Sequence, residues 1–235
     1  AVINHLVDHH YDITMKRTHR RPLPQGAITP RNALRFGVSL GVIGTLILAI
    51  WVNILTAVLT FFAMIGYAVI YTCYLKHATP QNIVIGGLSG ALPPLLGWTC
   101  ITGQINAEPL LLVLIIFVWT PPHFWALAID RVEDYQAAKI PMLPVTHGIA
   151  YTKLQIVLYT VLTVVITYIP VLIHMFGLFY VAATTLLNAR FVFLAIQCQR
   201  TEAKHLPKQL FFFSIKYLML LFLVMIIDHI WLAYA

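Results

Sequence analysis

The sequence has few charged residues and few cysteines, and both shortages exclude common classes of protein. Only 10% of the 235 residues are charged and 60% are hydrophobic, whereas about a quarter of the residues in an ordinary soluble domain are charged. Cys73, Cys100 and Cys198 lie in apolar runs without CxxC spacing. We therefore expect small buried cysteines with no disulfide framework, in an integral membrane protein.

The beginning of the sequence shows no cleavable signal sequence, since charge and histidine dominate it. The chain starts inside a polar motif and has no initiator methionine. We expect residues 1–235 to form a single transmembrane domain that is N-terminally incomplete, with at least one membrane span missing.

Long apolar runs dominate the remainder. Each is close to the roughly 20 residues that cross a bilayer as a helix, so the expected fold is all-α, a polytopic transmembrane helical bundle. The runs cover about 34–52, 54–75, 82–102, 109–129, 153–174, 177–198 and 210–232. Prolines inside three of them are expected to kink or break the helices: Pro93-Pro94, Pro121-Pro122 and Pro170.

Lysine and arginine alternate between the loops. The connections around Asn53, 103–108 and 175–176 contain neither residue. The basic loops are predicted to be cytoplasmic by the positive-inside rule: 13–33, the loop starting at Lys76, 130–152 and 199–209. The net charge of +7 is therefore interpreted as membrane orientation, with no nucleic-acid partner.

The first acidic cluster is Asn4, Asp8 and Asp12, at positions i, i+4 and i+8. On a helix these side chains lie about 6 Å apart along one face. Mg²⁺ is commonly held by one or two carboxylates and the phosphates of its substrate, so this pattern suits a metal carrying a phosphorylated ligand. A solvated helix end of mixed charge is the alternative. Basic residues follow the cluster: Lys16, Arg17, Arg20 and Arg21.

The second acidic cluster is Asp130, Glu133 and Asp134, which one helix face would present together. Five of the eight acidic residues lie in the two clusters, and both clusters fall on the predicted cytoplasmic face. Adjoining clusters could hold two or more Mg²⁺ ions around one diphosphate, with Asp8, Asp12, Asp130 and Asp134 as metal ligands. Interfacial salt bridges are the alternative. Candidate cations for the diphosphate oxygens are Arg17, Arg20, Arg21, Lys76, Arg131 and Lys139.

The chemistry expected from such a site is ionisation of an allylic diphosphate. Metal and cationic side chains stabilise the departing diphosphate, and aromatic faces can stabilise the carbocation left behind. Each candidate aromatic side chain for this role could instead serve only packing. These candidates are Tyr71, Tyr74, Trp98, Trp119, Trp125 and Tyr135.

The first cluster has the N-x-x-x-D-x-x-x-D form of the intramembrane UbiA-type prenyltransferases. Four further stretches narrow the resemblance to the protoheme IX farnesyltransferase (heme O synthase) family: Met15–Leu23, Asn82–Pro94, Trp119–Trp125 and Asp134–Val145. The motifs cover residues 1 to about 150, and beyond them only the hydropathy pattern is similar. Members of this family have about nine spans, which implies that the first span and part of the second are absent here.

The resemblance implies a reaction. A farnesyl group passes from farnesyl diphosphate to a vinyl group of heme B, water is added, and heme O forms, with Mg²⁺ as cofactor. It also implies a bacterial inner-membrane enzyme with a cytoplasmic active site, and heme A synthase or terminal oxidase assembly as partners. By position, Asn4, Asp8 and Asp12 form the first metal–diphosphate site.

The resemblance assigns Asp134 to the second site, with Arg131 beside it. The heme-specific pattern centres on Arg131, Asp134 and Tyr135. Asp130 is a candidate metal ligand because of its D-x-x-x-D spacing with Asp134. The metal-binding roles of Asp130 and Glu133 stay open. Lys16, Arg17, Arg20, Arg21, Lys76, Lys139 and Tyr135 are the expected substrate-binding residues.

His123 is a further substrate-binding candidate. It follows a double proline inside an apolar run, where an unpaired imidazole is costly. It could ligate heme iron or bond a propionate, or it could bond a backbone carbonyl freed by the prolines. Two other functions stay open: a prenyltransferase for a quinone-type or other aromatic acceptor, and a membrane transporter or heme-handling protein. Broken helices favour the transporter, and acids gathered at one face disfavour it.

Overall fold

The computed structural model describes residues 2–14 and 18–234, and every regular element in that part of the chain is helical. The chain divides into two compact units. Unit 1 comprises residues 1–105 and 133–142, and unit 2 comprises residues 106–132 and 143–235. The expected single transmembrane domain stays a prediction.

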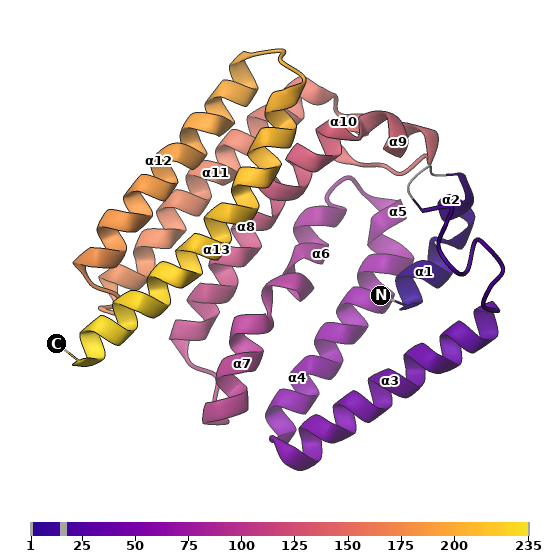
Figure 1. Cartoon of the computed structure of the whole chain (residues 1–235), viewed down its shortest axis with the longest axis horizontal. Coiled ribbons are helices and arrows are strands. Elements are labelled where there is room, and N and C mark those ends of the chain that lie inside the picture. Colours follow the sequence, from indigo (N-terminus) through magenta and orange to yellow (C-terminus); the bar gives the residue numbers. More distant parts are fainter. Residues whose placement is uncertain (1, 15–17, 235) are drawn as a thin grey trace. The chain divides into compact units, whose positions relative to one another are not determined.

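Unit 1 is built from three long helical runs, α3, α4 with η1, and α6 with α7, together with several short helices (Figure 1). Its elements are α1 (Val2–Val7), α2 (His9–Thr14), α3 (Pro30–Trp51), α4 (Ile54–Ile65), the π-helix η1 (Gly66–Leu75), α5 (Lys76–Ala78), α6 (Asn82–Ala91), α7 (Pro93–Thr102) and nearly all of α9 (Val132–Ala137). Unit 2 contains α8 (Ala107–Asp130), α10 (Leu143–Thr146), α11 (Ile149–Leu172), α12 (Leu178–Arg200) and α13 (His205–Tyr234).

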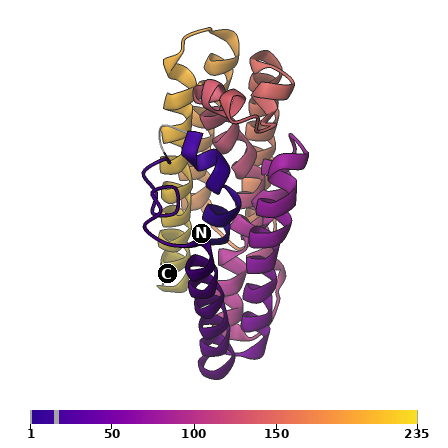
Figure 2. The same ribbon diagram turned by 90° about the vertical axis from the view of Figure 1, so that its right-hand side faces the viewer.

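Local capping defines the α3–α4 pair. Thr29 accepts the Asn32 N–H at the start of α3, and Asn53 accepts the Thr56 N–H at 2.8 Å at the start of α4. Such caps satisfy backbone donors that the helix itself leaves open. Because only two residues separate the helices, α3 and α4 pack side by side and antiparallel (Figures 1 and 2).

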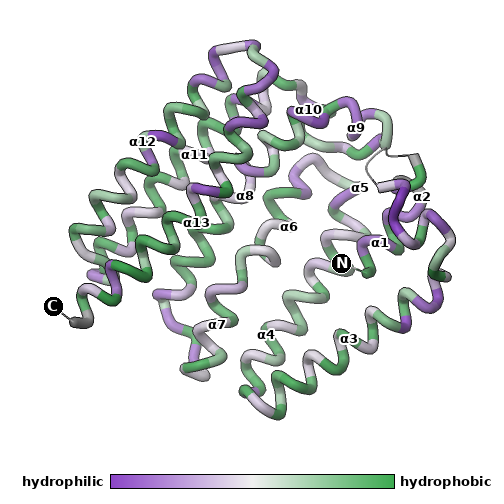
Figure 3. Tube along the Cα trace, in the orientation of Figure 1, coloured by the Kyte–Doolittle hydropathy of each residue, from purple (hydrophilic) through white to green (hydrophobic). Residues whose placement is uncertain are grey.

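Seven helical runs in the described chain are long and apolar enough to cross a membrane. They match the seven predicted runs, and the all-helical prediction is confirmed. Green, hydrophobic colour follows the long helices, whereas purple gathers over α2 and α9 (Figure 3). Cys198 is buried as expected, whereas Cys73 of η1 is exposed and Cys100 of α7 is half-buried.

The prolines act differently at different positions. The run 82–102 breaks as predicted, since α7 begins at Pro93. In contrast, α8 continues through Pro121-Pro122 and α11 through Pro170, so neither helix breaks there, and a kink at these prolines stays a prediction. Pro122 cannot donate to Val118 O, four residues earlier, and the Thr163 hydroxyl of α11 donates to that carbonyl at 3.2 Å instead. A neighbouring helix thus replaces the missing bond.

Unit 2 is tied together by buried polar contacts. The Tyr217 hydroxyl donates to Asn188 Oδ1 at 2.7 Å, Asn188 Nδ2 donates to Thr167 Oγ1 at 3.0 Å, and the Tyr180 hydroxyl donates to Thr167 O at 2.7 Å. Buried polar groups are stable when every partner is supplied. This network links α11, α12 and α13, and α13 also packs against α8.

Candidate functional site

The first acidic motif folds as two short helices that keep helical spacing across their junction. Asp8 separates α1 from α2, but its N–H still bonds Asn4 O at 2.9 Å, and the Asp12 N–H bonds Asp8 O at 2.8 Å. Asp8 is 4% exposed and Asp12 3%. Buried carboxylates need paired charges, so their surroundings determine what the motif can do.

Each of the two carboxylates is paired with a cation from another segment of unit 1. Lys76 Nζ lies 2.5 Å from Asp8 Oδ2, and Arg21 Nη1 lies 2.7 Å from Asp12 Oδ2. Lys76 comes from the start of α5, and Arg21 from the loop after α2. The structure therefore places two carboxylates and two cations in one cluster, which we call the α1–α2 charge cluster (Asp8, Asp12, Arg21 and Lys76).

Three other basic candidates follow the first acidic motif. Arg20 is exposed, and Lys16 and Arg17 lie outside the described residues. His5 is near the charge cluster, where burial, followed by the positive charge of Arg21, lowers its pKa from the usual 6.5. This lowered pKa favours the neutral form of His5.

The π-helix η1 delivers Lys76 to Asp8. Such helices are rare and occur often at functional sites. Its Tyr71 stacks on Tyr67 with ring centroids 5.6 Å apart. Both Asp8 and Tyr135 lie within electrostatic range of Tyr71. The first motif and the α9 segment of unit 1 therefore converge on one phenol ring, a convergence that the sequence pattern did not reveal.

The second acidic motif does not lie on one helix. Asp130 ends α8, Arg131 leaves the helical conformation at φ −121° and ψ 26°, and Asp134 lies in the first turn of α9. The prediction that one helix face presents Asp130, Glu133 and Asp134 together is therefore wrong. All three carboxylates are exposed. Asp134 and Tyr135 belong to unit 1, as do Asp8 and Asp12, whereas Asp130 and Arg131 belong to unit 2.

Lys139 follows α9 in unit 1. It adopts a left-handed backbone conformation at φ 54°, uncommon for a residue other than glycine, and its N–H bonds Gln136 O at 3.0 Å to close the end of the helix. Its side chain is exposed. The structure thus gives Lys139 a helix-terminating role, and its predicted contact with substrate stays a prediction.

The side chains of the described residues do not by themselves form a metal site. Within 2–14 and 18–234, no three His, Cys, Asp or Glu side chains cluster closely enough to hold a metal ion. The oxygen donors of Asn4, Asp8 and Asp12 nevertheless suit Mg²⁺, which takes few protein ligands and retains waters or phosphate oxygens. The motif fits a metal that arrives with its substrate.

His123 lies in a tightly built pocket of unit 2. Its ring stacks on Trp119 at 4.4 Å and 16°, and on Phe211 at 4.7 Å and 23°. Its Nδ1 lies 2.7 Å from the Ser214 hydroxyl. The expected alternative, a bond to a carbonyl freed by the prolines, is not what the structure shows, because a hydroxyl is the partner. Trp119 Nε1 also donates to Ser214 O at 3.0 Å, so this candidate aromatic serves packing.

Asn82 is a residue that the sequence reasoning missed. Its side chain is fully buried, and its Nδ2 donates to Lys76 O at 3.4 Å. Among the described residues, its Oδ1 has no hydrogen-bond partner. It supports the backbone from which Lys76 reaches Asp8. Its place at the start of the resembling stretch Asn82–Pro94 was the available signal.

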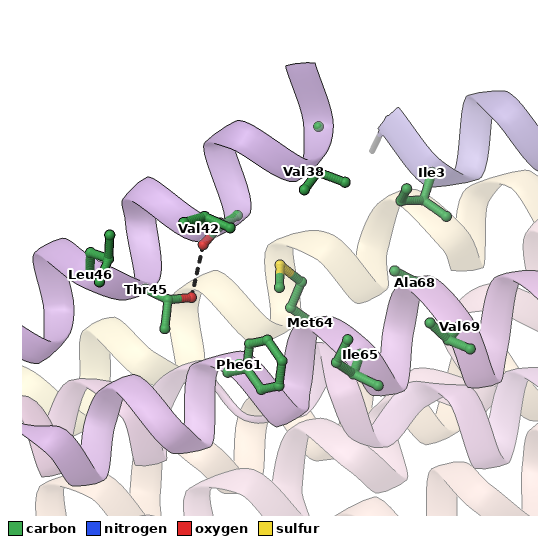
Figure 4. Close-up of a pocket in the computed structure, with 12 residues that line it drawn as sticks. Ile3, Val38, Val42, Thr45, Leu46, Phe61, Met64, Ile65, Ala68 and Val69 are labelled. Carbon is green, nitrogen blue, oxygen red and sulfur yellow. Dashed lines mark hydrogen bonds between the residues drawn. The ribbon is translucent and has the colours of Figure 1, made fainter. Parts of the chain in front are cut away.

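An apolar groove runs beside the first motif in unit 1. It encloses about 410 Å³ between α3 on one side and α4 with η1 on the other, and Ile3 of α1 lies at one end (Figure 4). Val42, Leu46, Phe61 and Met64 contribute apolar lining. The polar oxygen of Thr45 turns to Gly41 O at 2.8 Å, so the groove offers an apolar surface within one residue of Asn4.

Comparison with known proteins identifies the family of the chain. Residues 1–226 match the model of the UbiA prenyltransferase family. The chain is 57% identical over 229 residues to protoheme IX farnesyltransferase of Idiomarina loihiensis, covering 97% of this chain and 77% of that protein. It is 55% identical over 229 residues to protoheme IX farnesyltransferase of Stutzerimonas stutzeri, with 97% and 77% covered.

Two solved structures share the fold. One, of digeranylgeranylglyceryl phosphate synthase in membranes, has a TM-score of 0.76 at 21% identity and covers 97% of this chain and 80% of its own. The other, a UbiA homolog from Archaeoglobus fulgidus bound to GPP and Mg²⁺, has a TM-score of 0.58 at 15% identity and covers 95% and 81%. At these identities the likeness concerns the fold alone.

Proposed function

Because this chain belongs to the UbiA prenyltransferase family, we propose that it transfers the farnesyl group of farnesyl diphosphate to a vinyl group of heme B, with addition of water, to give heme O. The chain is a multi-pass integral membrane protein and a prenyltransferase. Family membership replaces the transporter hypothesis. The observation that carries the heme assignment is 57% identity to a protoheme IX farnesyltransferase, together with the α1–α2 charge cluster that such a reaction requires.

The donor diphosphate would bind at the charge cluster. Asp8 and Asp12, with Asn4 on the same helical face, are the proposed first metal site, and Asp134 of α9 is the proposed second. Asp130 is a further metal candidate by its spacing alone. Mg²⁺ bound there would neutralise the departing diphosphate. The Mg²⁺ bound to the UbiA homolog from A. fulgidus supports Mg²⁺ as the metal at the level of the family.

Lys76 and Arg21 would change partners when the donor binds. Both cations now hold carboxylate oxygens, and charge-assisted bonds to a diphosphate are of comparable strength. Once the metal occupies the carboxylates, these cations can donate to diphosphate oxygens and stabilise their developing charge. Arg131 is the proposed catalytic cation of the second site, with Tyr135 as the proposed neighbour of Asp134. The proposed outer contacts are Lys16, Arg17, Arg20 and Lys139.

In the transfer itself, heme B attacks the farnesyl cation and water then adds to the product of that attack. The bond between donor C1 and the diphosphate oxygen breaks and leaves an allylic cation. The π-electrons of the vinyl group form the new carbon–carbon bond, which leaves a cation beside the pyrrole. Water adds to that cation and loses a proton, giving the hydroxyl. His123 in unit 2 is the proposed contact with heme B.

The location of the reaction follows from charge. The basic loops and the charge cluster belong to the same predicted cytoplasmic face, so we place the active site there, in a bacterial inner membrane. Heme A synthase and terminal oxidase assembly are the proposed downstream partners, because they use heme O.

The deciding experiment is a product assay on the full-length protein in lipid nanodiscs. Heme B, farnesyl diphosphate and Mg²⁺ are supplied, and porphyrin products are identified by mass spectrometry. We expect heme O from the parent protein, and none from Asp8→Asn or without Mg²⁺. A parallel screen offers quinone-type acceptors with a labelled donor. Unaltered heme B together with a prenylated quinone would show that the acceptor assignment is wrong.

A further inference from the structure

We propose that Ser214 is a positioning residue that holds His123 as the Nδ1–H tautomer, so that Nε2 ligates the iron of heme B. The inference rests on the proposed function, because heme B is the ligand it concerns. It adds a residue from α13 to the acceptor site and selects one of the two heme contacts considered for His123.

The tautomer follows from counting the protons at Ser214. A serine hydroxyl has one proton to donate and two lone pairs that accept. The Ser214 hydroxyl donates to Phe211 O at 2.7 Å. Its 2.7 Å contact with His123 Nδ1 must therefore be one in which Ser214 accepts. The proton of a neutral imidazole then resides on Nδ1, and Nε2 has a lone pair.

The surrounding side chains keep the ring in this orientation. Trp119 and Phe211 stack on its two sides with centroids 4.4 and 4.7 Å away. Trp119 Nε1 donates to Ser214 O at 3.0 Å, which ties α8 to α13 at this level. Ser214 is fully buried. In the part of the chain that the structure describes, His123 Nε2 makes no hydrogen bond.

A lone pair at Nε2 distinguishes the two heme contacts. An ionised propionate only accepts hydrogen bonds, and Nε2 in this tautomer has no proton to donate. Heme iron, in contrast, takes a neutral imidazole nitrogen as an axial ligand. Metal-binding histidines usually donate their second ring N–H to a fixed acceptor, which is the arrangement that Ser214 provides.

The test measures heme binding separately from catalysis. Full-length protein in nanodiscs is titrated with heme B and with metal-free protoporphyrin IX, which has the same propionates but no iron. The variants are His123→Ala, Ser214→Ala and Ser214→Thr. Thr160→Val is the matched control, because Thr160 is a fully buried hydroxyl of unit 2 whose bond, among the described residues, is to Ile156 O of its own helix. Resonance Raman spectra of the ferrous complexes report the iron–histidine stretch.

We expect the parent protein and Thr160→Val to bind heme B with an iron–histidine band and to bind protoporphyrin IX more weakly. Ser214→Ala should bind heme B about 10- to 100-fold more weakly, with the band shifted to lower frequency, since Nδ1–H has lost its acceptor. Ser214→Thr should restore both properties. His123→Ala should lack the band and bind both porphyrins equally.

Two results would overturn the inference. One is equal binding of heme B and protoporphyrin IX by the parent protein without an iron–histidine band, which indicates a propionate contact. The other is an unchanged band and affinity in Ser214→Ala. Heme O formation without the band would refute iron ligation and leave the proposed function intact, whereas the band without any heme O would refute only the proposed function.

Discussion

Gly86→Ala should damage the protein far more than Gly90→Ala, although both substitutions add one methyl group to α6. A Cβ at Gly86 would lie 2.1 Å from Tyr71 Cδ2 and 2.8 Å from Tyr71 Cε2, well inside van der Waals contact. Tyr71 is itself stacked on Tyr67, so the ring has little freedom to move. At Gly90, a Cβ meets no atom of the described residues within 4 Å.

The magnitude follows from overpacking. Forcing a methyl group into a filled contact costs about 1–3 kcal/mol. Alanine at an open helical position, in contrast, stabilises the helix by about 0.5–1 kcal/mol relative to glycine. Tyr71 belongs to η1, which ends next to Lys76, so a displaced η1 also weakens the contact of Lys76 with Asp8. If this whole cost of about 1–3 kcal/mol is lost from the stabilisation of the transition state, kcat/KM falls by roughly 5- to 160-fold.

The assay combines thermal unfolding in detergent with steady-state heme O formation. Gly86→Ala should lower both the unfolding temperature and kcat/KM, and Gly90→Ala should lower neither. Equal behaviour of the two variants would refute the reasoning, because they share the helix and the chemical change and differ only in what the new Cβ meets.

Three further changes test other parts of the structure. Lys76→Met should lower kcat/KM for farnesyl diphosphate by about 10- to 160-fold, since a charge-assisted hydrogen bond contributes about 1.5–3 kcal/mol. The control is Lys208→Met, because Lys208 is exposed. Equal kinetics of the two variants would contradict the role of Lys76. Asp134→Asn should abolish heme O in the mass-spectrometric assay while the protein unfolds at the parent temperature. Asp228→Ala should cost about 1–3 kcal/mol of stability, measured by thermal unfolding. The reason is that the Asp228 carboxylate accepts two backbone N–H groups at the start of α12. Unchanged stability would show that this cap is dispensable.

The membrane-spanning helices were predictable because their evidence is local. Twenty consecutive apolar residues define a span wherever they occur. The predicted runs 34–52 and 54–75 accordingly match Pro30–Trp51 and Ile54–Leu75 to within a few residues. The identity of Asp8 and Asp12 as an acidic pair on one helical face was local as well, since it needed only the i, i+4 spacing.

The contacts that shape the site depend on packing between distant segments. Lys76 is 68 residues from Asp8, and its reach follows from the π-helical turns of η1, for which the residues carry no distinctive pattern. Ser214 is 91 residues from His123. The break at Arg131 is also set by packing, because nothing in Asp130–Asp134 is a strong helix breaker.

The charge cluster has a consequence for how substrate enters. Asp8 and Asp12 carry two negative charges, and Lys76 and Arg21 carry two positive charges, so the cluster is neutral as it stands. Buried ion pairs add little net stability, which makes catalysis the better explanation for these four side chains. A bare Mg²⁺ would add two uncompensated positive charges, and a bare diphosphate would add negative ones. A magnesium–diphosphate complex is closer to neutral, so the cluster favours metal and donor binding together, with the cations moving from carboxylate to phosphate oxygens in the same step.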